Sequence, residues 1–530
     1  MPDDDFILDC LDQLGDGREP GAAIRLATDR SSDLLATPGT AATLLSAPEG
    51  DTDRRLRLFA ALVERAHLDM EGGGRLGLSF LRDAEEAIDG LLDAGSLEFE
   101  TALALARAYG FAGIEAPESL LSFLVPGIAA LPGTEGYADD FDAEVDTLRR
   151  HAGVDAHALH ILLADSLALV PASLRPGLVH RVAERDREGY GLLTLYWLLD
   201  GAAEIRLAAA GGLLQRARRG SLDAASASAL PLIRTWIPAD GARPLLDAAL
   251  REARRRGLAG PVAPSDLRPV QLFGTVPDAS GGQSFAAALE GRDGPAAALV
   301  LVKAGQGVKD AFLVHGDDAP DALSWQVAEF GASAVAWEAL EPALKAALAD
   351  GFAAGRPPAA GLIDVASALG LMDLRPRAMT GQDWLACIDP AGEVAGLPAR
   401  RRDRLIRGSA NWPGDHEHVA GWCEGTATVD RLLDGAGGAP QLEAALWTHL
   451  DERRGHWALL MLRTAHVLRA GGDADWPSFA ATAAALLEGR ALTKVPIMEH
   501  ILRASIAAWQ VEEYGLAIGF PDDGAWPGSG

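Results

Sequence analysis

The chain has 530 residues, of which 48% are hydrophobic, and this composition predicts a folded protein with an ample core. Its formal net charge of −28 disfavours nucleic acid and anionic membrane surfaces as partners, because like charges repel. No apolar run approaches the ~20 residues of a membrane-spanning helix. Three widely spaced cysteines, Cys10, Cys387 and Cys423, indicate a reducing compartment and no disulfide framework. We therefore expect a cytoplasmic protein.

A run of short amphipathic helices is predicted for residues 1–262. In residues 52–70 the apolar side chains recur at spacings of three and four, with charges on the opposite face. The stripe consists of Leu56, Leu58, Phe59, Leu62, Val63 and Ala66. Glycine, proline and aspartate separate this helix from its successors. Such a series favours stacked helices in a solenoid or an irregular array.

One segment of this region carries a family resemblance. Residues 195–256 contain an acidic helix start at Glu204, a central Arg206, the alanine- and leucine-rich run 207–214 and a short turn into another helix. These features resemble a HEAT-type helical repeat over about 60 residues. The resemblance implies stacked helix pairs with a surface that binds protein partners.

The pattern changes after Pro261. Four short apolar runs follow, and the turn sequences "PDASGG", "GRDGP" and "GQG" separate them. Loops this short allow only antiparallel pairing, so we predict a four-stranded antiparallel meander. Helical patterns resume at Asp318 and would cover the sheet. Residues 265–378 thus form a small α+β module.

Residues 379–530 are predicted to form a tryptophan-rich helical domain. Eight of the twelve tryptophans of the chain lie here. Because each tryptophan can bury ~150–250 Å², this density indicates a compact helical core. The predicted fold class is therefore mainly α, with one small α+β module between two helical parts.

The turn "GQG" raises the possibility of a phosphate-binding loop. Such a loop requires the spacing G-x-x-x-x-G-K-[ST] and a following helix, whereas Gly305 and Gly307 are two residues apart and a strand follows them. A hairpin turn in which the glycines supply positive φ is the favoured interpretation.

Three charged residues near this turn form a candidate site. Strict alternation would place Asp310 on one strand face with Val308, Phe312 and Val314. The aspartate would then lie at an exposed strand end, or it would be buried with Lys303 or Lys309 as its partner.

Two further sets contain residue types that bind transition metals. His416, His418, Cys423 and Glu424 lie close in sequence, although the spacing also suits a helix start that buries Cys423. No second pair lies at zinc-finger spacing.

The second set is His449, Glu452 and His456, at positions i, i+3 and i+7. These residues share one face if the helix continues through Gly455. If Gly455 instead divides the segment into two helices, the three side chains are solvated.

The chain lacks the motifs G-x-S-x-G, H-E-x-x-H and C-x-x-C, and no G-x-G-x-x-G opens a helix. We therefore expect a non-catalytic protein-interaction or scaffold protein that binds a protein partner and uses no cofactor. The alternative is an enzyme or metal-dependent hydrolase whose site lies between the α+β module and the C-terminal helical domain.

Overall fold

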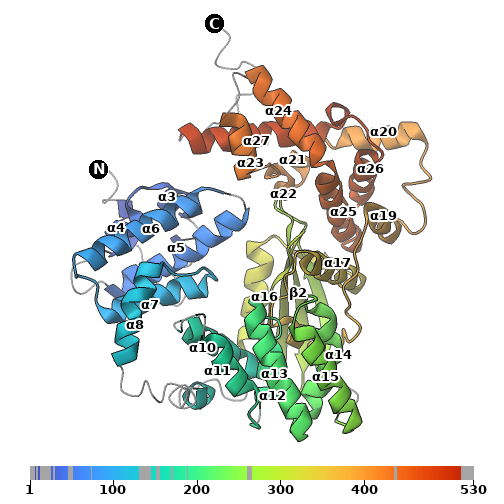
Figure 1. The fold of residues 1–530 in the computed structure, drawn as a ribbon. Helices are drawn as coiled ribbons and strands as arrows, with labels where there is room; N and C mark the ends of the chain where they lie inside the picture. Colours follow the sequence, from blue (N-terminus) through green and yellow to red (C-terminus); the bar gives the residue numbers. More distant parts are fainter. Residues whose placement is uncertain are drawn as a thin grey trace. The chain divides into compact units, whose positions relative to one another are not determined.

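The fold is taken from a computed structural model. It describes residues 6–7, 10–11, 26–27, 30–45, 52–72, 74–130, 145–150, 155–168, 170, 172, 174–187, 189–258, 265–434 and 439–514. The chain separates into two compact units, Met1–Ala263 and Pro264–Gly530 (Figure 1). The sequence GPVAPSDLRP, residues 260–269, is rich in proline and typical of a linker, and its first five residues lie outside the described residues. Within the described part, every helix is too short or too polar to cross a membrane.

The first unit is helical in its described residues. Its helices are α3 (Ser31–Ala36), α4 (Thr40–Leu45), α5 (Thr52–Gly72), α6 (Leu76–Asp93), α7 (Phe99–Phe111), α8 (Glu118–Ala130), α10 (Ala156–Ala168), α11 (Arg175–Ala183), α12 (Tyr190–Trp197), α13 (Ala203–Arg219), α14 (Ala224–Trp236) and α15 (Ala242–Arg255).

The amphipathic stripe predicted for residues 52–70 is the buried face of α5. Leu58, Phe59, Leu62, Val63 and Ala66 are fully buried. The Phe59 ring lies 6.0 Å from Phe80 of α6 and 6.2 Å from Tyr109 of α7. The period of the sequence pattern thus selects the face on which α5, α6 and α7 pack.

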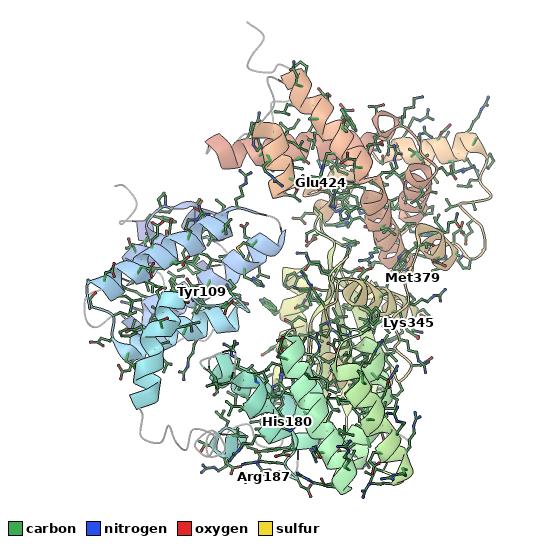
Figure 2. All side chains as sticks on the ribbon, viewed as in Figure 1. Tyr109, His180, Arg187, Lys345, Met379 and Glu424 are labelled. Atoms are coloured by element: carbon green, nitrogen blue, oxygen red, sulfur yellow. The ribbon has the colours of Figure 1, made fainter. Side chains whose placement is uncertain are left out.

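Helices α11 to α15 form an array that is held together by buried arginines. Arg206 of α13 is 4% exposed. Its Nη2 lies 2.6 Å from Asp240 Oδ2, and its Nη1 donates to the Asp200 and Gly201 carbonyls at 2.6 and 2.7 Å. Arg206 therefore connects the turn before α13 to the turn before α15. Between α11 and α13, the ring of His180 contacts the Ala208 carbonyl at 3.1 Å (Figure 2).

The second unit contains one sheet. Its strands are β1 (Arg268–Gly274), β2 (Gly282–Gly291), β3 (Gly294–Lys303), β4 (Gly307–His315) and β5 (Ser333–Val335). The order is β4-β3-β2-β1-β5, and every neighbouring pair is antiparallel. The predicted four-stranded meander is confirmed. The short strand β5 extends it by pairing with β1.

Helices cover the sheet and continue to the end of the described chain. Helices α16 (Asp318–Glu329), α17 (Leu340–Ala353) and α18 (Leu362–Ala368) pack against its strands. The later helices are α19 (Gly381–Ile388), α20 (Ala399–Gly408), α21 (Trp412–Asp415), α22 (Glu417–Ala420), α23 (Ala427–Asp434), α24 (Ala439–Glu452), α25 (Arg454–Ala470), α26 (Trp476–Leu487) and α27 (Pro496–Tyr514).

Tryptophans form the centre of this second helical core, as predicted. Trp384, Trp412, Trp422 and Trp457 are each at most 2% exposed. Trp412 stacks on Phe479 of α26, with ring centroids 3.7 Å apart and planes 6° apart. The mainly α fold class with a small antiparallel sheet is therefore confirmed.

Candidate functional site

The candidate site is a cavity of about 740 Å³ in the first unit. It is lined by the C-terminal end of α7, the start of α8 and helix α10. The segments that connect α10 to α11 and α12 to α13 complete the lining. Gly113 ends α7 with φ +71°, a conformation that favours glycine, and the chain then turns toward α8.

Part of the lining is aromatic and apolar, and we call this part, which includes Trp197, Ile114 and Ile205, the floor of the cavity. Trp197 is 1% exposed, and its ring lies 6.4 Å from that of His160, edge to face. His160 also contacts Tyr196 at 5.3 Å. Burial, with a smaller contribution from His157, lowers the pKa of His160 to about 4. The imidazole is therefore neutral at physiological pH.

Charged side chains also line the cavity. Glu115, Asp200 and Glu204 supply carboxylates, and Arg175 supplies the one guanidinium among the lining residues. Asp200 Oδ1 accepts a hydrogen bond from the Ala202 backbone at 2.7 Å. Burial raises the pKa of Asp200, although this amide, Arg206 and Arg175 oppose the shift. The cavity thus combines an apolar floor with an excess of carboxylates.

Sequence reasoning did not identify this cavity. Of its charged residues, it singled out only Glu204, as the acidic start of a repeat-like helix. The available signal was the run "YWLLDGAAE", residues 196–204, in which an aromatic pair precedes two carboxylates at a helix junction. Glu115 belongs to a distant part of the chain, and only packing brings it to the same cavity.

In the second unit, the segment that holds His449, Glu452 and His456 forms two helices, as the second alternative predicted. The break lies at Arg453 and not at Gly455, because α24 ends at Glu452 and α25 begins at Arg454. The expectation that all three side chains are solvated is correct for Glu452 but wrong for the two histidines. Glu452 is exposed, whereas His449 is 9% exposed.

The carboxylate near these histidines is Glu424, not Glu452 (Figure 2). Glu424 is 3% exposed, and its Oε1 accepts from Arg453 Nε at 2.8 Å and from Trp457 Nε1 at 2.9 Å. His449 Nε2 lies 3.9 Å from Glu424 Oε2. Burial is the largest cause of the lowered pKa of His456. We call these five residues, Glu424, His449, Arg453, His456 and Trp457, the Glu424 cluster.

His416 and His418 lie together, with ring centroids 5.7 Å apart. His416 Nε2 is 3.3 Å from Asp475 Oδ2. Burial and the neighbouring His416 lower the pKa of His418 to about 4. Cys423 is half-buried. Across the described residues, no three histidine, cysteine, aspartate or glutamate side chains are arranged to hold a metal ion.

The "GQG" stretch is the turn between β3 and β4, as the hairpin interpretation predicted. The backbone N–H of Gly305 donates to Asp350 Oδ2 at 3.0 Å, and Arg463 Nη2 donates to the same oxygen at 2.8 Å. A Cβ on Gly307 would lie 2.8 Å from the Gly351 Cα. The turn therefore docks on α17 and contacts a carboxylate of the protein.

A β-bulge at Lys309 changes the predicted alternation. Leu301 pairs with Asp310 and Val302 with Val308, so Lys309 is an extra residue in β4. Asp310 shares a face with Phe312, as predicted, but Val308 lies on the opposite face. Because β4 is an edge strand, the bulge and its lysine also hinder pairing with another chain. Lys303 ends β3 beside the turn.

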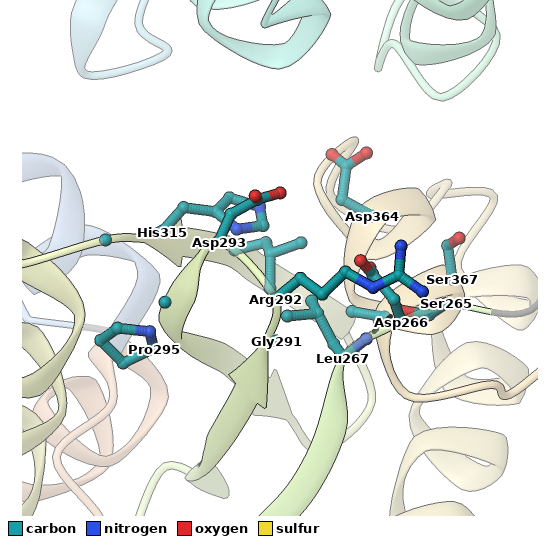
Figure 3. Close-up of a pocket in the computed structure, with 14 residues that line it drawn as sticks. Ser265, Asp266, Leu267, Gly291, Arg292, Asp293, Pro295, His315, Asp364 and Ser367 are labelled. Carbon is teal, nitrogen blue, oxygen red and sulfur yellow. Dashed lines mark hydrogen bonds between the residues drawn. The ribbon is translucent and has the colours of Figure 1, made fainter.

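A second, smaller cavity of about 280 Å³ lies at one end of the sheet (Figure 3). Arg292 extends from the β2–β3 turn toward Asp266 and Ser367, and Asp293 lies near His315. Its volume is below the ~300–1,000 Å³ of typical ligand pockets. The cavity in the first unit is therefore the better candidate.

These features define a class of protein: mainly helical, with two compact units, a small antiparallel sheet and a large cavity among helix ends. Three family models match the chain, namely the uncharacterised y4lR N-terminal domain at residues 4–117, the Y4lR second domain at 171–257 and the Y4lR C-terminal helical domain at 382–510. The uncharacterized protein y4lR of Sinorhizobium fredii (strain NBRC 101917 / NGR234) is 30% identical over 492 residues, which cover 91% of this chain and 93% of that protein. The chain belongs to the Y4lR family.

No solved structure matches the chain. The residues that line the cavity come from two of the matched family domains, since Glu115 lies in the N-terminal domain and Arg175 in the second domain. They do not include a HEAT repeat, so that resemblance stays a prediction.

Proposed function

We propose that this protein is a non-catalytic interaction or scaffold protein whose helical N-terminal unit binds a segment of a protein partner in the 740 Å³ cavity. The cavity is the observation that carries the proposal. Its volume falls within the ~300–1,000 Å³ of ligand pockets, and it has their usual combination of an apolar floor and a few polar groups.

The helices beneath the cavity support this role by forming a fixed platform. Arg206 connects two turns of the array through buried hydrogen bonds, and one of these turns carries Asp200 at the cavity. A preorganised site loses little conformational freedom on binding. The resemblance of this segment to HEAT repeats also favours a partner-binding surface.

A second candidate function is a hydrolase that uses the Glu424 cluster. Two observations favour it. Trp422 Nε1 lies 3.4 Å from the Pro277 carbonyl of the β1–β2 loop, and His456 interacts with the backbone of Ala279 in the same loop. The cluster therefore lies where the sheet segment meets the C-terminal helices. However, Glu424 Oε1 is already bound by two donors in the core.

Site-specific photo-crosslinking in host cells tests the interaction role. A photoreactive phenylalanine analogue would replace Ala164, which lines the cavity, or Ala225, an exposed residue of α14 outside it. We expect one discrete covalent protein product from position 164 and none from position 225. Filling the cavity with Ala172→Trp should remove the product, whereas Ala225→Trp should leave it unchanged.

Equal labelling from both positions, or no product from position 164 in the folded protein, would overturn the interaction role.

Elemental analysis of protein purified without a histidine tag tests the hydrolase. Near-stoichiometric zinc or iron that is lost on His449→Ala, but retained on substitution of the exposed His315, would support a metal-dependent enzyme.

A further inference from the structure

We infer that the partner segment presents a basic side chain, arginine or lysine, to the cavity of the first unit. The inference rests on the proposed function and specifies the chemistry of the ligand. Three features of the cavity support it: the charges of its lining, the partners that those charges already have, and the apolar floor.

The lining carries a net charge of −2. Three carboxylates, on Glu115, Asp200 and Glu204, stand against the one guanidinium of Arg175 (3 − 1 = 2). Arg175 is held locally, because its Nε donates to the Val170 carbonyl at 2.7 Å. A cationic ligand therefore gains more from this lining than an anionic one.

Within the described chain, two of the three carboxylates have no ion-pair partner, and the third, Asp200, interacts with Arg206 and Arg175. Glu115 and Glu204 are exposed, and neither forms an ion pair with the residues that the structure describes. Arg206 lies near Asp200, but its guanidinium is engaged by Asp240 and by two backbone carbonyls. Glu204 also lies in the first turn of α13, where the helix dipole favours a negative charge. The dipole accounts for Glu204, and the Ala202 amide with the two nearby arginines accounts in part for Asp200, whereas Glu115 has neither.

The floor suits the apolar part of a long basic side chain. Trp197, Ile114 and Ile205 line the cavity, and they can contact the methylene stem while the charged head reaches the carboxylates. An arginine head could also lie over the face of an aromatic ring. The neutral imidazole of His160 adds no positive charge to repel it.

The test uses the full-length protein labelled with 5-fluorotryptophan and observed by ¹⁹F NMR. Twelve tryptophan resonances are expected, and the resonance of Trp197 is the one that Trp197→Phe removes. The probes are N-acetyl-arginine methylamide and its citrulline analogue, which has nearly the same shape without the charge. We expect the arginine probe to shift the Trp197 resonance in a saturable manner, and citrulline to bind at least ~10-fold more weakly.

Variants connect the signal to the lining. Asp200→Asn should weaken binding of the arginine probe at least ~5-fold, and the double variant Asp200→Asn/Glu204→Gln should weaken it further. Glu86→Gln is the matched control, since Glu86 is an exposed carboxylate of α6 that does not line the cavity. It should leave binding unchanged. Trp412, in the second unit, reports any general effect of the probe on this acidic protein.

Each outcome decides a claim. Equal binding of the citrulline probe, or unchanged binding in the double variant, would overturn the basic ligand. Stronger binding of an N-acetyl-glutamate probe would show that Arg175 dominates, and would also overturn it. If the arginine probe does not shift Trp197 while crosslinks from position 164 persist, the basic ligand is wrong and the interaction role stands. If the Trp197 shift and the crosslinks from position 164 are both absent, the basic ligand and the interaction role are both wrong.

Discussion

The cavity of the first unit and the Glu424 cluster of the second use carboxylates in opposite ways. In the cluster, Arg453 and Trp457 donate to Glu424 at 2.8 and 2.9 Å, and the charge is satisfied by the protein. In the cavity, Glu115 and Glu204 line an empty space and have no ion-pair partner among the described residues. Both sites lie beside histidines and tryptophans, so residue type alone does not separate them.

The difference is informative because the two arrangements have opposite consequences for stability. Removing one member of a buried ion pair leaves the other charge buried without a partner, which is costly. A carboxylate that lines a cavity without a partner contributes little to folding and is available to a ligand. Loss of stability on substitution should therefore mark the cluster, and loss of binding should mark the cavity.

The largest effect is expected for Glu424→Ala. The substitution leaves the buried Trp457 N–H and the partly exposed Arg453 guanidinium without their acceptor. We expect the free energy of unfolding to fall by about 2–3 kcal/mol, because the Trp457 N–H stays buried without a partner while Arg453 can still reach water. Urea unfolding followed by tryptophan fluorescence measures it. Glu452→Ala, at the exposed end of α24, should change stability by less than about 0.5 kcal/mol. Similar losses for both variants would contradict a structural role specific to Glu424.

Acid should destabilise both units through buried histidines, of which His160 and His418 have the largest lowering of the pKa. Burial lowers the pKa of His160 and of His418 to about 4, whereas an unfolded histidine titrates near ~6.5. The unfolded state therefore binds the proton first as pH falls. The stabilisation is complete above pH ~6.5 and is lost down to pH ~4, at up to about 1.4 kcal/mol per pH unit for each histidine.

The ¹⁹F resonances of Trp197 and Trp412 allow this loss to be assigned to a unit. His160→Phe should reduce the pH dependence of the urea midpoint reported by Trp197 and leave that of Trp412 unchanged. Some dependence should remain, because burial also lowers the pKa of His157. A pH dependence at Trp197 that is the same with and without the substitution would show that His160 titrates normally in the folded protein.

The β3–β4 turn is a second place in the second unit where polar groups are satisfied internally. Gly307 has φ +107°, and a Cβ there would meet the backbone of Gly351, so Gly307→Ala should destabilise by about 1–3 kcal/mol. Gly305 has φ +70° with open space around it, so Gly305→Ala should cost only about 1 kcal/mol. Chemical unfolding of both variants measures the difference. Equal losses of stability in the two variants would mean that the close approach of Gly307 to α17 adds nothing to the cost of placing a side chain at positive φ.

Much of the fold could be predicted from the sequence because it depends on local periodicity. The stripe on α5 has a helical period, and it is the buried face. The four strands β1 to β4 follow from apolar runs and short loops, and the meander is their simplest pairing. These features need no knowledge of distant contacts.

The remaining features depend on contacts that local patterns do not encode. Strand β5 has three residues, and its pairing with β1 defines it. The bulge at Lys309 is a matter of register, which alternation cannot reveal. Glu424 approaches His449 from 25 residues earlier in the chain (449 − 424 = 25), and Glu115 approaches Asp200 across 85 residues (200 − 115 = 85). The candidate site is therefore almost wholly a product of packing.

The smallest change in stability, and the sharpest test of the comparison, is expected for Asp200→Asn. Burial raises the pKa of Asp200, so the folded state favours the protonated form more than the unfolded state does. Any stabilisation by this group is therefore present below the unfolded pKa of ~3.9 and is lost as pH rises through the folded pKa. At pH 7 the ionised carboxylate is a net cost to folding. Asparagine removes that charge and retains an oxygen that can accept from the Ala202 amide.

We therefore expect the free energy of unfolding of Asp200→Asn at pH 7 to stay within about 0.5 kcal/mol of wild type or to rise, and its urea midpoint to follow. Binding of the arginine probe should weaken. The isosteric change in the cluster, Glu424→Gln, is the matched control and should lower the midpoint, because Arg453 loses its charged partner. If Asp200→Asn lowers the midpoint as much as Glu424→Gln does, Asp200 is a structural carboxylate. The two regions would then differ only in burial, and the excess of carboxylates at the cavity would no longer indicate a ligand.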